Sequence, residues 1–244
     1  MLLLTGRMPA TLTVLFATCA AIHPVFRWAA LRTWDGSDEP YGVVALLAVV
    51  ALVLGRRGAA SRPRSEISLI GPALCLGLYA ATYPFLTPLP RGMIAMTALA
   101  LLLSRLYFGS SLNLGLFGLL QLALPMIASI QFYLGYPLRV LVAEATARLL
   151  RCGGFDVSVV GVGLELGERS ILVDAPCSGI KMLWAGAFVT CLFAAHFRLR
   201  VRETLLYMTS AALSILTANI LRAAALFYVE LRLLALPASA HGLI

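Results

Sequence analysis

The stretch ILVDAPCSGIKMLWAGAF, residues 171–188, joins a short polar segment to the start of a long apolar run. The polar segment holds an acid, a proline, a cysteine, a serine and a glycine. The apolar run continues to Phe197 and contains Lys181, the only lysine of the chain. About 17 to 25 predominantly apolar residues suffice for a helix to cross a bilayer. The stretch therefore predicts a membrane-spanning helix over 180–197, with Cys177 just before its first turn.

The composition of the whole chain indicates an integral membrane protein. Hydrophobic residues make up 61% and charged residues 12% of the 244 residues, which excludes an ordinary soluble domain. The formal net charge of +8 would suggest nucleic acid binding in a soluble protein. Here the arginines cluster in short loops between apolar runs, as the positive-inside rule predicts. Membrane topology thus explains the charge, and we expect no nucleic acid partner.

The apolar runs predict an all-α polytopic membrane protein with about seven transmembrane helices, folded as one domain over residues 1–244. The first run lacks a small-residue cleavage site followed by a soluble domain, so we interpret it as a retained span rather than a signal peptide. The predicted spans cover residues 8–31, 41–54, 67–86, 93–107, 114–134 and 180–197, and a seventh starts near residue 204.

The longest segment between predicted spans, residues 135–178, is expected to form a small extracytoplasmic insert with an amphipathic helix and a short β element. Residues 136–154 place apolar side chains on one helical face and charged ones off it, which is typical of a helix on the membrane surface. Residues 155–175 have β-branched side chains around glycines, which favours two or three short strands. The predicted apolar face consists of Leu138, Leu141, Val142, Ala145 and Leu149.

The charge distribution predicts the orientation in the membrane. Arginines are dense in residues 56–66 and again in residues 196–203, which are therefore expected to be cytoplasmic. Alternation of the spans then places the acidic loop 32–42 and the insert 135–178 outside. We expect a multi-pass protein of the plasma (inner) membrane whose site lies at the extracytoplasmic face.

Cys177 is expected at the outer end of the sixth span, where two effects favour its thiolate. Free backbone amides at a helix N-terminus stabilise an anion, and Lys181 lies one turn away on the same face. The alternative is a structural cysteine paired with Cys152 on the same oxidising side. The other three cysteines, which lie within apolar runs, are interpreted as packed hydrophobic residues; they are Cys19, Cys75 and Cys191.

Two further polar residues are predicted near the same outer boundary. Arg222 lies within an apolar stretch about 27 Å along a helix from Thr204, and it shares a face with Asn219. An arginine inside a span faces a cavity or a partner, unless it extends along the helix end to the interface. His241 follows the seventh span. Cys177, Arg222 and His241 together are the parts of a thiol acyl-transfer site: a nucleophile, a charge stabiliser and a proton carrier.

At these residues the sequence resembles the exosortase/archaeosortase family of membrane cysteine transpeptidases. The segment APCSGIK, residues 175–181, resembles the Cys-Ser-Gly motif of the family followed by an apolar residue and a base. NILR, residues 219–222, resembles the Asn-x-x-Arg motif, and His241 stands where the family has its later histidine. The catalytic residues implied are Cys177, Arg222 and His241, and the supporting residues are Ser178, Gly179, Lys181 and Asn219.

The resemblance implies cleavage of exported proteins whose C-terminus carries a Pro-Glu-Pro-like motif, a transmembrane anchor and a basic tail. It implies that Cys177 forms an acyl-thioester, that His241 carries the proton and that Arg222 stabilises the oxyanion or orients the thiolate. Partners would be these exported proteins and membrane lipids, with no cofactor and no metal. The acceptor, whether water, a lipid amine or a glycan, stays open.

The chain also departs from the family pattern. The loop residues Trp34, Asp35, Tyr41 and Gly42 resemble the Tyr-Ser-His-Gly region of exosortases but lack its Ser-His pair. The family continues into another span after its histidine, so two alternatives stay open: an eighth helix follows residue 244, or a frayed terminal tail holds His241. The competing interpretation is a non-catalytic multi-span transporter, or a scaffold for exopolysaccharide or envelope assembly, in which Cys177 is only packed.

Overall fold

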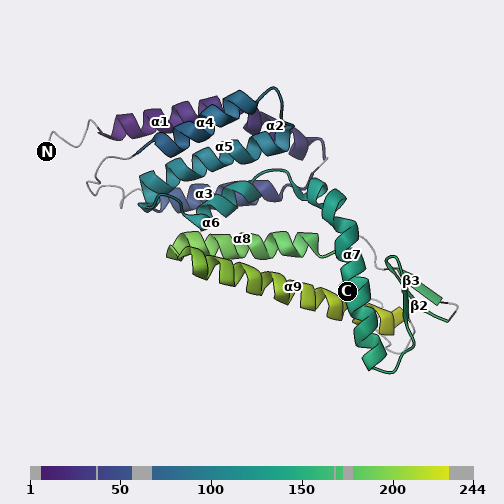
Figure 1. Cartoon of the computed structure of the whole chain (residues 1–244). Coiled ribbons are helices and arrows are strands. Elements are labelled where there is room, and N and C mark those ends of the chain that lie inside the picture. Colours follow the sequence, from purple (N-terminus) through teal and green to yellow (C-terminus); the bar gives the residue numbers. More distant parts are fainter. Residues whose placement is uncertain (1–6, 37, 57–67, 168, 173–177, 231–244) are drawn as a thin grey trace. The chain divides into compact units, whose positions relative to one another are not determined.

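The computed structural model describes residues 7–36, 38–56, 68–167, 169–172 and 178–230, and the protein is mostly helical (Figure 1). The helices are α1 (Arg7–Ala21), α2 (His23–Trp34), α3 (Tyr41–Leu54), α4 (Ile70–Thr82), α5 (Pro88–Leu103), the π-helix η2 (Ser104–Phe108), α6 (Leu114–Leu122), α7 (Ile127–Cys152), α8 (Ile180–Phe197) and α9 (Val201–Glu230). The strands are β1 (Ser158–Val160), β2 (Gly163–Leu166) and β3 (Arg169–Leu172).

Two compact units divide the chain. Unit 1 comprises residues 1–128 and 187–208, and unit 2 comprises residues 129–186 and 209–244. In unit 1, α5 packs against α4 and α6, and α6 packs against α3. The fully buried side chains of this core include Leu102, Leu116, Leu119 and Leu120.

Two glycines of α6 bring it against the second half of α8 within unit 1. A Cβ atom at Gly115 would meet the backbone of Ala195, and one at Gly118 would meet the sulfur of Cys191. Small residues at helix interfaces allow close approach of backbones, which favours helix association in membranes. Cys191 is buried in this contact, as predicted for a packed cysteine.

Three helical segments are long and apolar enough to cross a membrane: α5 with η2 (Pro88–Phe108), α8 and α9. Two bent pairs, α1 with α2 at 59° and α6 with α7 at 95°, raise this number to five if each pair is one span. The apolar helices α3 and α4 are shorter, with 14 and 13 residues. Each of the seven predicted runs contains a helix or a bent pair, and length and composition support three to five spans in the described residues.

The prediction of one continuous span over residues 114–134 is wrong. Helix α6 ends at Leu122, and α7 starts at Ile127 and runs without interruption into the predicted surface helix. Pro125 lies in the break. Its ring disfavours helical geometry at the preceding residue and it donates no backbone hydrogen bond, so the chain turns here. Pro137 is near the boundary predicted between this span and the insert, but in the structure it lies inside α7.

The apolar face predicted for α7 is not the face that the helix buries within the protein. Of its five members only Val142 is buried, whereas the side chains of Leu141 and Leu149 are 52% and 42% exposed. The buried face is rotated toward residues small enough for another helix to approach closely; it consists of Val142, Ala143, Thr146, Ala147 and Leu150. The exposed leucines remain available to lipid.

The short β element is confirmed as a three-stranded antiparallel sheet in the order β1-β2-β3. Leu164 of the central strand pairs with Val159 on one side and Ile171 on the other. Its side chain is buried in the core of unit 2, together with Phe227 of α9 and Leu150 of α7. The sheet therefore packs onto the α7–α9 pair through its apolar face.

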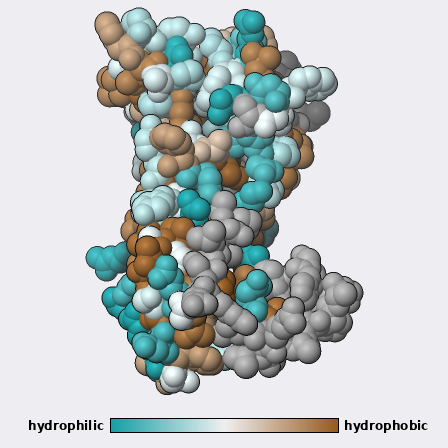
Figure 2. Space-filling view, turned by 90° about the vertical axis from the view of Figure 1, so that its right-hand side faces the viewer, coloured by the Kyte–Doolittle hydropathy of each residue, from teal (hydrophilic) through white to brown (hydrophobic). Residues whose placement is uncertain are grey.

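Large apolar side chains also remain on the surface, where Figure 2 shows hydrophobic residues beside hydrophilic ones. Phe16 in unit 1 is 76% exposed and Phe132 in unit 2 is 79% exposed. Exposed apolar side chains in this number are expected where helices face lipid rather than water. Together with the apolar helices, they make the chain a multi-pass membrane protein.

Arg56 joins the end of α3 to the C-terminal end of α8 within unit 1. Its Nη2 donates hydrogen bonds to the carbonyl oxygens of Ala195 at 3.2 Å and His196 at 2.6 Å. Its guanidinium lies 4.3 Å from the ring centroid of Phe108. Burial, and secondarily the charge of Arg198, lower the pKa of Arg56. The first residues of the two arginine-rich segments, Arg56 and His196, are therefore in contact. The prediction that both segments lie on one membrane face requires such proximity.

Candidate active site

The two motifs singled out in the sequence meet at Gly179 and Asn219 in unit 2. A Cβ atom at Gly179 would lie 3.2 Å from Nδ2 of Asn219, whose side chain is 1% exposed. Gly179 also has a φ of +71°, which side chains with a Cβ rarely adopt. Its carbonyl oxygen accepts the first hydrogen bond of α8, from the amide of Leu183 at 2.8 Å. Glycine is therefore required here by both backbone geometry and space.

Ser178 is held by a hydrogen bond from outside its own motif. Its Oγ donates to Oε1 of Gln131 on α7 at 3.2 Å, and the serine is 2% exposed. The amide of Gln131 folds back over Gly135, where a Cβ atom would lie 3.0 Å from Nε2. The residue next to Cys177 is therefore fixed by α7. Gln131 was not among the candidate site residues predicted from the sequence. A glutamine within the apolar stretch MIASIQFYLG, residues 126–135, is nevertheless a recognisable signal of a buried polar contact.

The first half of α8 and the middle of α9 pack closely because of a second glycine. A Cβ atom at Gly186 would meet Cδ1 of Ile215, so the two backbones approach at this point. Gly186 lies two turns after Gly179, and Ile215 lies one turn before Asn219. Both contacts lie on one face of α8, and their order along the chain shows that α8 and α9 run antiparallel here. This pairing aligns the start of α8 with Asn219.

On its other side, α9 is fixed by α7. Ala223 and Ala224 of α9 belong to the buried cluster that contains Ala143 and Ala147 of α7. Thr146 Oγ1 lies 3.5 Å from the carbonyl oxygen of Ile220, to which it donates. Arg222 lies next to Ala223 in the chain, and its own side chain is only half-buried. Helix α9 is thus held by both neighbours at the turn that carries the Asn-x-x-Arg motif.

The described residues contain part of the predicted site. Arg222 lies one helical turn after Asn219 on the same face of α9. Lys181 is the second residue of α8 and its side chain is exposed. Cys177 and His241 lie outside the described residues. The structure therefore brings the Ser-Gly part of the first motif to the asparagine of the second.

The remaining cysteines are free thiols, as far as the described residues go. Cys152 is exposed at the end of α7 and forms no disulfide with a described cysteine. Cys19 and Cys75 are half-buried in α1 and α4. Among the residues that the structure describes, no group of three or more His, Cys, Asp and Glu side chains could hold a metal ion.

A model of the transmembrane exosortase family (Exosortase_EpsH) matches residues 33–234, which include both motifs. The chain belongs to the transmembrane exosortase family. The resemblance seen in the sequence is thereby confirmed. Members of this family are generally membrane cysteine peptidases or transpeptidases. Comparison of this exosortase-family chain with curated proteins and with solved structures finds no match.

Proposed function

We propose that this protein is a membrane-embedded cysteine protease or transpeptidase that cleaves C-terminal sorting signals of exported proteins. The signal would consist of a Pro-Glu-Pro-like motif followed by a transmembrane anchor. The observation that supports the proposal is the packing of Gly179 against Asn219, because it brings the Ser-Gly part of the first motif beside the asparagine of the second. Membership of the exosortase family supports the same reaction class.

Catalysis would begin with attack of the Cys177 thiolate on the carbonyl carbon of the scissile peptide bond. The new S–C bond converts that carbonyl oxygen to an oxyanion, which the guanidinium of Arg222 stabilises. Collapse of this intermediate breaks the C–N bond. The leaving amine takes a proton from the imidazolium of His241, and an acyl-thioester remains on Cys177.

The second half-reaction releases the exported protein. An acceptor with an O–H or N–H group attacks the thioester carbonyl while His241 accepts its proton, and the S–C bond then breaks. Water as acceptor gives hydrolysis, whereas a lipid amine or a glycan gives transfer. The thiolate of Cys177 is regenerated, and Lys181 together with the free amides at the start of α8 favours its anionic form.

The other motif residues would position the nucleophile. Gly179 forms the turn into α8, and Gln131 holds Ser178, which is bonded directly to Cys177 in the chain. Asn219 fixes the turn from the side of α9. A site at the extracytoplasmic face would meet a substrate where its membrane anchor begins, so the substrate helix would lie beside the enzyme in the bilayer.

The test is processing of a co-expressed exported protein with such a C-terminal anchor, followed as loss of the anchor fragment by immunoblot. Cys177→Ala should abolish processing, and Cys177→Ser should nearly do so, because a hydroxyl is a much weaker nucleophile at neutral pH. Cys152→Ala is the matched control and should process normally. Processing at the wild-type rate by correctly inserted Cys177→Ala would exclude the enzyme and favour a transporter or scaffold.

The role of His241 has its own variant. His241→Ala should slow processing strongly, since both half-reactions move a proton through its ring. Normal processing in this variant, with Cys177→Ala inactive, would assign the proton transfer to another group or to water. That result would leave the cysteine mechanism in place and remove only the histidine from it.

A further inference from the structure

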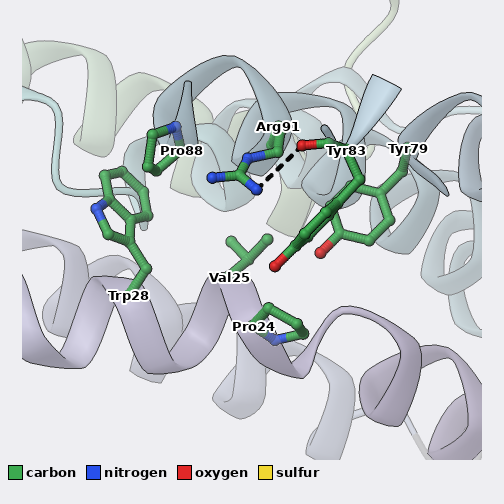
Figure 3. A pocket seen from close by; sticks show the side chains of 7 residues that line it. All are labelled: Pro24, Val25, Trp28, Tyr79, Tyr83, Pro88 and Arg91. Carbon is green, nitrogen blue, oxygen red and sulfur yellow. Dashed lines mark hydrogen bonds between the residues drawn. The ribbon is translucent and has the colours of Figure 1, made fainter. Parts of the chain in front are cut away.

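A cavity in unit 1, away from the residues of the proposed reaction, combines aromatic walls with one cation. Its volume is about 170 Å³, and it lies between the start of α2, the end of α4 and the start of α5 (Figure 3). Trp28, Tyr79 and Tyr83 supply the aromatic surface, and Arg91 supplies the charge. The remaining lining residues are Pro24, Val25 and Pro88, so no described residue of the lining is a carboxylate.

The guanidinium of Arg91 is held in place inside this cavity. Its Nη1 donates to the carbonyl oxygen of Tyr83 at 3.2 Å, as the dashed line in Figure 3 marks. Its central carbon lies 4.4 Å from the centroid of the Tyr83 ring. A guanidinium has five N–H donors, and this arrangement uses one of them on the protein backbone. The others are available to an anionic ligand.

The hydroxyl of Tyr79 is a second polar group that indicates a ligand in this cavity. The residue is 5% exposed, and its hydroxyl forms no hydrogen bond with any described residue. Its ring packs edge-on against Tyr83 with 5.7 Å between the centroids, which fixes its direction. A buried hydroxyl without a partner costs free energy, and a ligand oxygen in the cavity would remove this cost.

The position of the cavity favours a lipid over a soluble anion. Tyr83 follows the last turn of α4, and Arg91 lies in the first turn of α5, so the cavity lies where the apolar helices end. Trp, Tyr and Arg at such ends are typical of the level of lipid headgroups. Below this level α4 exposes a stripe of apolar side chains at helical spacing, formed by Ile70, Leu74 and Leu78. It extends over about 12 Å, a suitable surface for an acyl chain.

We propose that this cavity binds the phosphodiester headgroup of an anionic phospholipid. One phosphate oxygen would accept hydrogen bonds from Arg91, and another would accept from the hydroxyl of Tyr79. Headgroups with an amine are disfavoured for two reasons: the described lining residues include no carboxylate, and a guanidinium covers the Tyr83 ring. Phosphatidylglycerol, which carries hydroxyls instead, is the expected class. The proposal does not depend on the proposed protease reaction.

Native mass spectrometry of the full chain, delipidated in mild detergent and titrated with phosphatidylglycerol, tests the site. Wild type should retain one tightly bound phosphatidylglycerol in preference to phosphatidylcholine. Arg91→Gln should weaken this binding about tenfold or more, since it removes a charge-assisted contact. Tyr79→Phe, which preserves the packing, should weaken it about threefold. Arg27→Gln, which replaces an exposed arginine of the same α2 that does not line the cavity, is the control and should bind normally.

Two further ligands distinguish a lipid from other anions. Inorganic phosphate and a short acidic peptide should each fail to displace phosphatidylglycerol at equal concentration. Displacement by phosphate that depends on Arg91 would assign the cavity to a soluble anion, and displacement by the peptide would assign it to a protein ligand. Either result, or equal phosphatidylglycerol binding in wild type, Arg91→Gln and Tyr79→Phe, would overturn the proposal.

Discussion

The amide of Asn219 on α9 fills the space beside Gly179 at the start of α8, with Nδ2 3.2 Å from the position a Cβ would take. A residue of the Asn-x-x-Arg motif therefore limits the size of a residue in the Cys-Ser-Gly motif. Gly179 follows Cys177, the proposed nucleophile, by two positions in the chain. A change of size at Gly179 or Asn219 therefore alters the packing of both motifs.

Gly179→Ala should lower the rate of processing at least about tenfold. The substitution combines a strained φ of +71° with a methyl group pressed against Asn219; the conformational strain alone costs about 1 to 2 kcal/mol. Gly36→Ala is a matched control, because Gly36 has the same φ of +71° but nothing within 4 Å of its Cβ position. The measurement is the processing rate at equal amounts of inserted protein. Equal losses in both variants would mean that strain, and not the contact with Asn219, is responsible.

Ser178→Ala and Gln131→Ala should each reduce processing, and the double variant should be little worse than either single one. Both single changes break the same hydrogen bond, the 3.2 Å contact from Ser178 Oγ to Gln131 Oε1. Such shared effects are not additive. A loss of about threefold to tenfold corresponds to one buried hydrogen bond. The check is a double-mutant cycle on the processing rate.

Gln121→Ala provides the control for that cycle. Gln121 donates to Thr97 Oγ1 at 3.1 Å and to the carbonyl oxygen of Met93 at 3.2 Å within unit 1. Its loss should lower stability without changing the processing rate per folded molecule. Fully additive losses in Ser178→Ala with Gln131→Ala would contradict the positioning role of Gln131.

Arg222→Lys should reduce processing by about 10²-fold or more although it keeps the positive charge. A lysine ammonium cannot reproduce the planar set of guanidinium donors, and loss of one oxyanion donor typically costs about this much. Arg148→Lys is the control, since Arg148 forms an exposed ion pair with Glu144 at 3.1 Å, and such pairs contribute little. Wild-type processing by Arg222→Lys would restrict Arg222 to an electrostatic or structural role.

Part of the fold could be predicted because long apolar runs bounded by polar residues leave few choices. The runs over residues 41–54 and 180–197 coincide with α3 and α8 at both ends. The short β element also follows from its local residues, since glycines separate its strands. Family membership follows from the Cys-Ser-Gly and Asn-x-x-Arg motifs in their order along the chain.

The errors arise where tertiary packing decides between similar local options. The segment around α7 is apolar on more than one side, so its periodicity did not reveal that Ala143 and Ala147 face α9. Pro125 and Pro137 both disfavour a helix, and only the surrounding structure determines that the chain turns at the first. The contact between Gln131 and Ser178 joins residues 47 positions apart, which no local pattern indicates.

The predicted orientation can be tested with thiol labelling of intact cells by a membrane-impermeant maleimide. In a variant that keeps only Cys152, the label should attach from outside, because this exposed residue ends α7 in the predicted extracytoplasmic insert. In a cysteine-free background, Arg200→Cys should react only after permeabilisation, since Arg200 is exposed in the segment predicted to be cytoplasmic. A variant that keeps only Cys177 should react from outside and faster than the Cys152 variant, as a thiol with a lowered pKa does near neutral pH.

The reverse pattern, with Arg200→Cys labelled in intact cells and both native cysteines protected, would place the nucleophile in the cytoplasm. Exported substrates would then be out of its reach, and the proposed reaction would have to be abandoned even if the fold and the packing of Gly179 against Asn219 were correct.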